Sequence, residues 1–302
     1  MQLRFLDYFV ALAREKHFAR AAEACHVTQP TLSAGIAALE EMLGKRLVVR
    51  DRRFIDLTPE GHAILPFARQ LLADHEGLRR AIDAPAGPLR GELRIGSIPA
   101  AMPCIGHLMR ALRAQHPRLQ VTIRSLTSRE IERALLDYEL EAGLTYLHDD
   151  PPAQVRAVPL YSERYMFATR TDSPLGTSDA VTWRDVAATP LCLLHQGMQN
   201  RRILDAHLAR LGLAITPVAT ADSYVALLSM VAHGGLSSIV TDSHAEFVAG
   251  DPELRVIEIV DPAPPNSIGL VVLDREPLSP LARAALAVAE TIELTASLRA
   301  RR

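Results

Sequence analysis

The sequence changes its pattern at Pro85-Ala86-Gly87-Pro88, a stretch through which no single helix or strand can run. Before this stretch apolar residues recur at helical spacing, and after it short apolar runs alternate with helical segments. With 302 residues, the chain is long enough for two or three domains that each bury a core. We therefore expect a helical N-terminal part and an α/β C-terminal part.

Three helices are predicted near the N-terminus. The first two are indicated by the apolar spacing between Leu3 and Ala13 and by the segment Phe18 to Ala24. The third has Thr28 as its N-cap and Pro30 in its first turn, and it ends at Gly44. Its apolar face consists of Leu32, Ile36, Leu39 and Leu43.

A basic hairpin follows the third helix. Leu47 to Val49 and Phe54 to Leu57 are predicted as two short strands, joined by a segment rich in arginine. Three helices followed by such a hairpin are typical of a winged helix-turn-helix. We assign residues 1–58 to this DNA-binding domain.

Thr58-Pro59-Glu60 is a strong start signal for a long helix, and we assign residues 59–88 to a linker helix and hinge. One stripe of this helix has the spacing of a two-stranded coiled coil: Ile64, Ala68, Leu71, His75, Leu78 and Ile82. The stripe predicts a dimerisation helix. Because His75 is polar, the alternative that the stripe packs on the winged helix stays open.

Residues 89–302 are predicted to form two α/β lobes with a cleft between them. The alternation of strands and helices from Leu93 onward favours parallel sheets with helices on both faces. Lobe I is expected at about 89–162 and 267–302, because the last strand and helix have no unit of their own and can return to it. Lobe II is expected at about 163–266.

The third helix and the hairpin carry the candidate DNA contacts. Helical geometry turns Gln29, Pro30 and Ser33 away from the apolar face, where side-chain donors and acceptors can meet base edges. The wing carries Arg50, Arg52 and Arg53, which are suited to phosphates or the minor groove. By itself the helix could equally be a solvated helix of a small bundle.

Composition and motifs exclude several classes of protein. No stretch approaches the ~18 apolar residues of a membrane span, and no signal peptide is evident, so we expect a cytoplasmic protein. Cys25, Cys104 and Cys192 are far apart and indicate neither a disulfide framework nor a zinc site. No catalytic or nucleotide-binding motif is present, so we expect no enzyme, no catalytic residue, no cofactor and no metal.

The segment from Phe18 to Ser33 resembles the helix-turn-helix of LysR-type transcriptional regulators. The resemblance continues through Leu39 to Gly44, Arg50 and Leu57-Thr58-Pro59-Glu60-Gly61, so that it covers residues 3–72 almost without a gap. It implies a homodimer or homotetramer that binds an inverted repeat in double-stranded promoter DNA and affects RNA polymerase. Gln29, Pro30, Ser33 and Arg50 match positions at which the family contacts DNA. Ala34-Gly35 departs from the pattern, which predicts thin base recognition there.

The C-terminal half resembles the family's effector domain, which has a fold like that of periplasmic solute-binding proteins. The resemblance implies a small-molecule effector in the cleft. Ligands in such folds collect at the carboxyl ends of strands and at helix N-termini, which favour a small organic anion. By that rule the candidate effector contacts are Ser97, Thr127, Ser128, Tyr146 and Gln196.

Several alternatives stay open. Thr127 with Glu130 is also a capping box, and Arg201 could bind a carboxylate or simply be solvated. A thiol redox regulator would need Cys104 and Cys192 to meet, although they are predicted in different lobes. A pure solute-binding protein would be secreted and would lack the N-terminal domain.

Overall fold

A computed structural model describes residues 2–50, 54–83, 89–147, 154–248 and 250–292. The chain divides into two compact units, one made of residues 1–87 with 136–139 and the other of residues 88–135 with 140–302. Among the described residues, no helix is long and apolar enough to cross a membrane.

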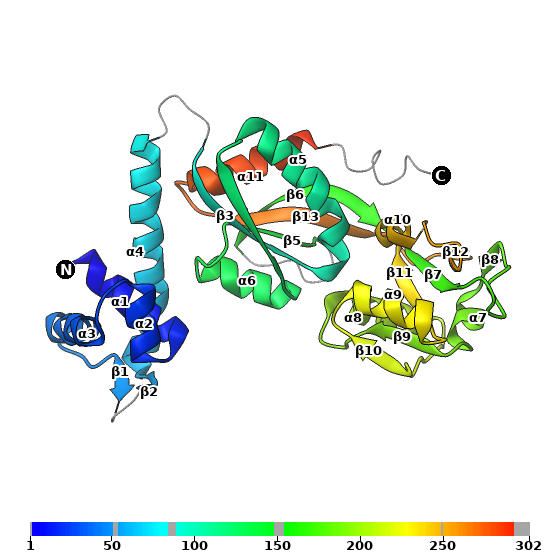
Figure 1. Ribbon diagram of the computed structural model, residues 1–302, viewed down its shortest axis with the longest axis horizontal. Helices are drawn as coiled ribbons and strands as arrows, with labels where there is room; N and C mark the ends of the chain where they lie inside the picture. The colour runs from blue at the N-terminus through cyan, green and yellow to red at the C-terminus, as the bar shows by residue number, and fades with distance from the viewer. Residues whose placement is uncertain (1, 51–53, 84–88, 148–153, 249, 293–302) are drawn as a thin grey trace. The chain divides into compact units, whose positions relative to one another are not determined.

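The N-terminal unit consists of four helices and a two-stranded antiparallel hairpin (Figure 1). Its elements are α1 (Leu3–Glu15), α2 (Phe18–Ala24), α3 (Gln29–Leu43), β1 (Val48–Arg50), β2 (Phe54–Leu57) and α4 (Pro59–Asp83). The predicted winged helix is therefore present.

Helix α3 begins and ends where its sequence signals lie. Thr28 is its N-cap, with Oγ1 accepting a hydrogen bond from the Thr31 N–H, and Gly44 adopts a left-handed conformation after its last turn. Leu32, Ile36 and Leu39 are completely buried against α1 and α2. This apolar face determines which side of α3 is turned outward.

The wing and the start of α4 approach each other at Gly61. The Leu47 carbonyl oxygen accepts a hydrogen bond from the Thr58 N–H, and a Cβ built on Gly61 would clash with that same oxygen. Only glycine leaves the backbone room for this approach.

The predicted stripe on α4 has two different environments. Its N-terminal part packs on the winged helix, where Ala68 is buried and Ile64 is half-buried. Its C-terminal part is exposed: Leu71 to 44%, Leu78 to 60% and Ile82 to 68%. The first part of the stripe therefore packs on the winged helix, while dimerisation through the exposed second part stays a prediction.

Lobe I of the C-terminal unit is built on a five-stranded sheet with the order β4-β3-β5-β13-β6. Its strands are β3 (Gly91–Ser97), β4 (Leu119–Ser125), β5 (Ala142–Tyr146), β6 (Val155–Glu163) and β13 (Asn266–Leu273). Its helices are η1 (Pro99–Cys104), α5 (Ile105–Gln115), α6 (Ser128–Leu136) and α11 (Pro280–Thr291). The last strand and helix return to lobe I as predicted.

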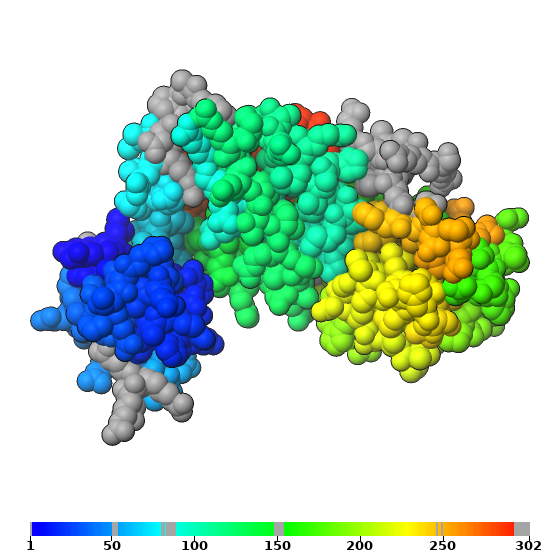
Figure 2. All heavy atoms as spheres, viewed as in Figure 1, coloured from blue at the N-terminus to red at the C-terminus, as the bar shows by residue number. Residues whose placement is uncertain are grey.

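Lobe II is built on a six-stranded sheet with the order β10-β9-β11-β7-β12-β8. Its strands are β7 (Tyr165–Arg170), β8 (Ala180–Val181), β9 (Leu191–Leu194), β10 (Ala219–Ala221), β11 (Ser237–Thr241) and β12 (Leu254–Ile259). Its helices are α7 (Trp183–Ala187), α8 (Gln199–Arg210), α9 (Tyr224–His233), η2 (Asp242–His244) and α10 (Ala245–Val248). Figure 2 shows lobe I mostly in green and lobe II mostly in yellow and orange.

The prediction of purely parallel sheets is wrong for both lobes. Strands β3, β4 and β5 are parallel, but β13 is antiparallel to both β5 and β6. In lobe II, β7 is antiparallel to β11 and β12. The chain leaves lobe I through β6 and returns to it through β13. Because β6 and β13 are neighbours and carry the chain in opposite directions, they must be antiparallel.

We predict that Gly61→Ala lowers the free energy of unfolding of the N-terminal unit by about 2 kcal/mol or more, because Cβ would clash with the rigid Leu47 carbonyl group. Gly77 lies on the same helix and has no atom within 4 Å of a built Cβ, so it provides a matched control. Gly77→Ala should instead raise the free energy of unfolding by about 0.5–1 kcal/mol. Thermal and urea denaturation would measure both changes, and equal effects of the two substitutions would contradict the packing argument.

Candidate functional site

The outward face of α3 is slim and nearly uncharged in its first three turns. Gln29, Pro30, Ala34 and Ala37 are exposed, and Ser33 is half-buried. Such a face suits close approach to base edges in the major groove. These residues stay predicted DNA contacts.

Gly35 does not belong to this outward face. It is buried, and a built Cβ would lie 2.5 Å from Tyr8 Cδ2 and 3.1 Å from Phe5 Cδ1. The glycine lets the Tyr8 ring pack directly on α3. A side chain at this position would enter the core, so the predicted thin base recognition at Ala34-Gly35 depends on Ala34 alone.

The basic residues of the wing can be placed only in part. Arg50 ends β1 and pairs with Phe54 of β2, while Arg52 and Arg53 lie outside the described residues. Lys45 and Arg46 are exposed at the end of α3. Positive charge therefore accompanies the slim face of α3.

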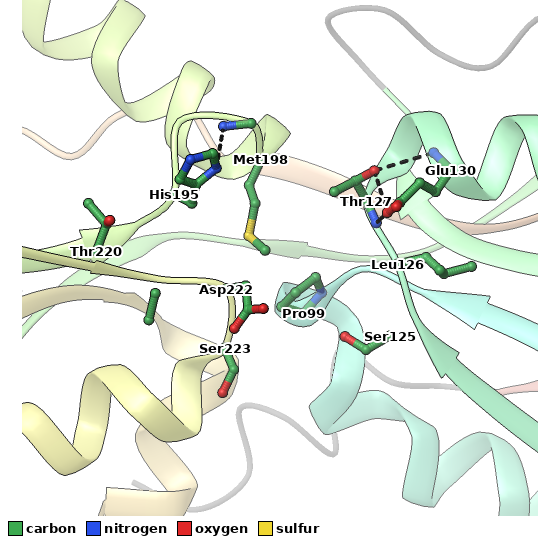
Figure 3. Close-up of a pocket in the computed structure, with 12 residues that line it drawn as sticks. Pro99, Ser125, Leu126, Thr127, Glu130, His195, Met198, Thr220, Asp222 and Ser223 are labelled. Carbon is green, nitrogen blue, oxygen red and sulfur yellow. Dashed lines mark hydrogen bonds between the residues drawn. The ribbon is translucent and has the colours of Figure 1, made fainter.

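A cleft with a volume of about 830 Å³ lies between lobe I and lobe II. Figure 3 shows Thr127 and Glu130 on one wall and His195, Asp222 and Ser223 on the other. Its full lining is Pro99, Ser125, Leu126, Thr127, Glu130, His195, Gly197, Met198, Thr220, Ala221, Asp222 and Ser223. This is the volume of a typical small-molecule site.

A narrow recess of about 10 Å³, enough for one water-sized group, shares residues with the cleft. It is lined by Ile98, Pro99, Ala100, Thr127, Ser128, Tyr146, Leu194, Met198, Gln199 and Asn200. The first residues of α6 and α8 are among them. Two positive helix ends therefore meet at one small space.

The two helix ends differ in how they are capped. At α6 the Thr127 N–H and Oγ1 each donate to Glu130 Oε2 at 2.8 Å, which is the predicted capping box. These bonds lower the pKa of Glu130, which is therefore ionised. At α8 the N-cap is Met198, which has no side-chain cap, and the first turn carries no acid. The Asn200 N–H in the first turn of α8 thus has no partner among the described residues and is available to a ligand.

The structure brings three of the five predicted effector contacts together. Thr127 lines both the cleft and the recess, and Ser128 and Tyr146 line the recess. Ser97 is fully buried and donates its hydroxyl to the Ile98 carbonyl, while Gln196 is exposed and outside both linings. None of the five has been tested with a ligand, so all stay predictions.

Sequence reasoning missed several lining residues. Gln199 and Asn200 begin a helix at a strand's carboxyl end, so the helix-terminus rule would have found them. Glu130 was considered only as part of a capping box, whereas the structure places its carboxylate and that of Asp222 on the cleft. Arg201 is neither solvated nor free for a ligand, because it is 2% exposed and donates to Asp205 and to the Leu194 carbonyl.

A buried polar cluster lies directly behind the recess. Tyr146 Oη donates to Glu163 Oε1 at 2.5 Å, and Asn200 Nδ2 donates to Tyr146 Oη at 2.7 Å. Glu163 is completely buried, and its Oε2 has no partner among the described residues. The cluster connects β5 and β6 of lobe I with α8 of lobe II.

Glu163 of this cluster and His244, a buried residue of lobe II, have strongly shifted pKa values. Burial raises the pKa of Glu163 to about 8, and the hydrogen bond from Tyr146 offsets this only in part. Burial lowers the pKa of His244, which stacks on Tyr224 at 3.9 Å, to about 3. At neutral pH both side chains are therefore predominantly uncharged.

The three thiols are poor candidates for redox chemistry. Burial raises the pKa of Cys104 to about 12 and that of Cys25 to about 11, and it also raises the pKa of Cys192. All three are free cysteines. A reactive cysteine needs thiolate character, which these environments suppress.

Comparison with known proteins agrees with the winged helix and the two-lobed domain. Residues 3–62 match the model of the bacterial regulatory helix-turn-helix proteins of the LysR family, and residues 86–291 match the LysR substrate binding domain. This chain belongs to the LysR family. It is a DNA-binding transcriptional regulator with an effector-binding domain, and it is not an enzyme.

Two curated relatives of this LysR-family regulator cover most of both chains. The DNA-binding transcriptional dual regulator OxyR of Escherichia coli K12 is 30% identical over 284 residues, covering 92% of this chain and 91% of the relative. The SDS degradation transcriptional activation protein of a Pseudomonas species is 34% identical over 296 residues, covering 93% of each.

Two solved structures also resemble this regulator over their full lengths. A full-length OxyR variant from Pseudomonas aeruginosa has a TM-score of 0.78 at 28% identity, covering 99% of this chain and 100% of the other. Full-length CbnR in complex with its target DNA has a TM-score of 0.68 at 25% identity, covering 96% and 99%.

We predict that Glu163→Gln becomes more stable relative to the wild type as the pH rises from about 5 to about 8. Between its ordinary pKa of 4.5 and its folded pKa of about 8, Glu163 binds a proton in the folded chain but not in the unfolded chain. The wild type therefore loses up to about 1.4 kcal/mol of unfolding free energy per pH unit in this window, and glutamine removes that loss. Urea denaturation at several pH values would measure the difference.

Asp179, an exposed carboxylate of lobe II, provides the control variant Asp179→Asn. His244 contributes the opposite slope between about pH 3 and 6.5, but it is present in every variant and cancels in the comparison. A Glu163→Gln curve parallel to the wild-type curve would show that Glu163 is not protonated in the folded protein.

Proposed function

We propose that this regulator binds an inverted repeat upstream of its target genes through α3 and the wing. In this proposal a small organic anion in the cleft between the lobes modulates the binding and thereby the access of RNA polymerase. The active form is a homodimer or homotetramer, and the protein works in the cytoplasm.

The effector part of the proposal rests on one observation, the recess between α6 and α8. The first turn of α8 offers the Asn200 N–H with no side-chain cap, and the Ser128 hydroxyl has no partner among the described residues. Both groups favour an anionic oxygen such as that of a carboxylate. The predicted contacts Thr127, Ser128 and Tyr146 surround this position.

The DNA part is supported by the slim face of α3 and the basic residues that follow it. Gln29 is exposed at the helix start, and Lys45 and Arg46 are exposed after its end. Base contacts from the helix would supply sequence specificity, and phosphate contacts from the basic residues would supply much of the affinity. The similar CbnR has been solved with its target DNA.

The oligomeric part is supported by the second half of α4. Leu71, Leu78 and Ile82 form an exposed apolar stripe at coiled-coil spacing, and no described residue of the protomer covers it. A second copy of the helix would bury the stripe. A dimer also matches the two halves of an inverted repeat.

We predict that Ala34→Glu weakens binding to the operator by at least about tenfold, because a carboxylate on the exposed face of α3 would meet phosphates and base acceptors. Ala34→Ser is the matched control, since it keeps a small neutral side chain at the same position. Footprinting on the DNA upstream of the protein's own gene, at two salt concentrations, measures both variants.

Protection of two sites that weakens with salt, and is lost only in Ala34→Glu, would support the proposal. Equal binding by both variants would exclude α3 as the DNA-contacting helix. No protection by the folded wild-type protein at low salt would contradict the proposed operator.

The names of several relatives raise the alternative of peroxide sensing. We predict that hydrogen peroxide leaves DNA binding equally unaffected in the wild type and in a variant with Cys25, Cys104 and Cys192 all changed to serine, because the thiols are protonated and largely buried. A peroxide response that disappears in the serine variant would establish thiol sensing instead.

A further inference from the structure

The charges on the cleft are unusual for a site that takes an anion alone. Of its twelve lining residues, Glu130 and Asp222 carry carboxylates, and none is a lysine or arginine. The two carboxylates stand on opposite walls, one at the start of α6 and the other before α9 (Figure 3). A purely anionic ligand would therefore meet negative charge on both sides with no side-chain cation to offset it.

Both carboxylates have capacity left for a ligand. The capping box engages Oε2 of Glu130, which leaves Oε1 without a protein donor among the described residues. Asp222 is exposed and has no hydrogen bond or ion pair within the described part of the chain. Ser223, and not Asp222, caps α9 by accepting from the Ala226 N–H. Helix capping therefore does not account for Asp222.

The recess has the opposite character. Ser128 is 9% exposed, its hydroxyl has no partner, and it lines the recess beside the uncapped start of α8. Behind the recess, Tyr146 donates to the buried Glu163, which carries no charge at neutral pH and so does not repel an anion. The donors therefore lie in the recess, and the carboxylates lie on the cleft. The recess and the cleft share Pro99, Thr127 and Met198.

We propose that the effector is a zwitterion, an amino acid or a similar small molecule that carries both a carboxylate and an ammonium group. One carboxylate oxygen enters the recess, where it accepts from Ser128 and from the Asn200 N–H in the first turn of α8. The ammonium group lies in the cleft between Glu130 and Asp222. This inference rests on the proposed effector site and specifies its ligand class.

Other charged groups near the cleft are compatible with this arrangement. His195 accepts from the Gly197 N–H at Nδ1, which leaves Nε2 as the ring nitrogen that can face a ligand. Arg124 acts on Glu130 electrostatically, but it is not part of the lining. Neither group replaces the missing side-chain cation for a purely anionic ligand.

The test is isothermal titration calorimetry of the full-length protein without DNA. Each of the twenty common L-amino acids is titrated alongside two analogues with the same carbon skeleton. One is the carboxylic acid without the ammonium group, and the other is the amine without the carboxylate. At least one amino acid should bind, and both of its analogues should bind at least about tenfold more weakly, because each loses one charge pair. A carboxylic acid that binds as tightly as its amino acid, or a failure of all amino acids to bind, would overturn the proposal.

Variants separate the two ends of the ligand. Glu130→Gln, which can keep the capping box, and Asp222→Asn should each weaken the amino acid at least about tenfold without weakening its carboxylic acid analogue. Ser128→Ala should weaken both, and Asp179→Asn is the control for an exposed carboxylate outside the lining. Equal losses for both ligands in Glu130→Gln and Asp222→Asn would refute an ammonium site.

The inference and the proposed function can fail independently. Binding of carboxylic acids alone, together with an effect on the DNA footprint, would keep the regulator and its effector site but reject the zwitterion. Binding of an amino acid to a protein that protects no DNA would keep the zwitterion site and reject the proposed operator.

Discussion

The hydrogen bonds from Asn200 to Tyr146 and from Tyr146 to Glu163 hold together the place where the two lobes meet. Tyr146 ends β5, Glu163 ends the strand that leads into lobe II, and Asn200 lies in the first turn of α8. A neutral Glu163 is the form that can be buried here without an ion partner.

This cluster determines what the recess can bind. Asn200 uses its side chain on Tyr146, and its backbone N–H at the recess stays without a partner among the described residues. Because Tyr146 accepts from Asn200 and donates to Glu163, its hydroxyl hydrogen is already engaged. Ligand recognition in the recess therefore falls to Ser128 and the Asn200 N–H, which favour a negative oxygen.

The N-terminal unit was largely predictable because its signals are local. Thr28, Gly44 and the apolar face of α3 define one helix, and all three lie within a few turns of each other. Gly35 could not be understood this way, since its role depends on the Tyr8 ring from another helix. The antiparallel strands of both lobes were missed for the same reason, because strand direction depends on where the chain crosses between lobes.

The cleft illustrates the same limit for function. The helix-terminus rule pointed to Thr127 and Ser128 and to an anion, since it concerns backbone donors that any sequence provides. It could not relate Glu130 to Asp222, because about ninety residues separate them along the chain. The two carboxylates limit the charge of the ligand only because the fold places them on facing walls of the cleft. The class of ligand therefore depends on the whole lining of the folded cleft. The helix-terminus rule alone describes only the end of the ligand that carries the carboxylate.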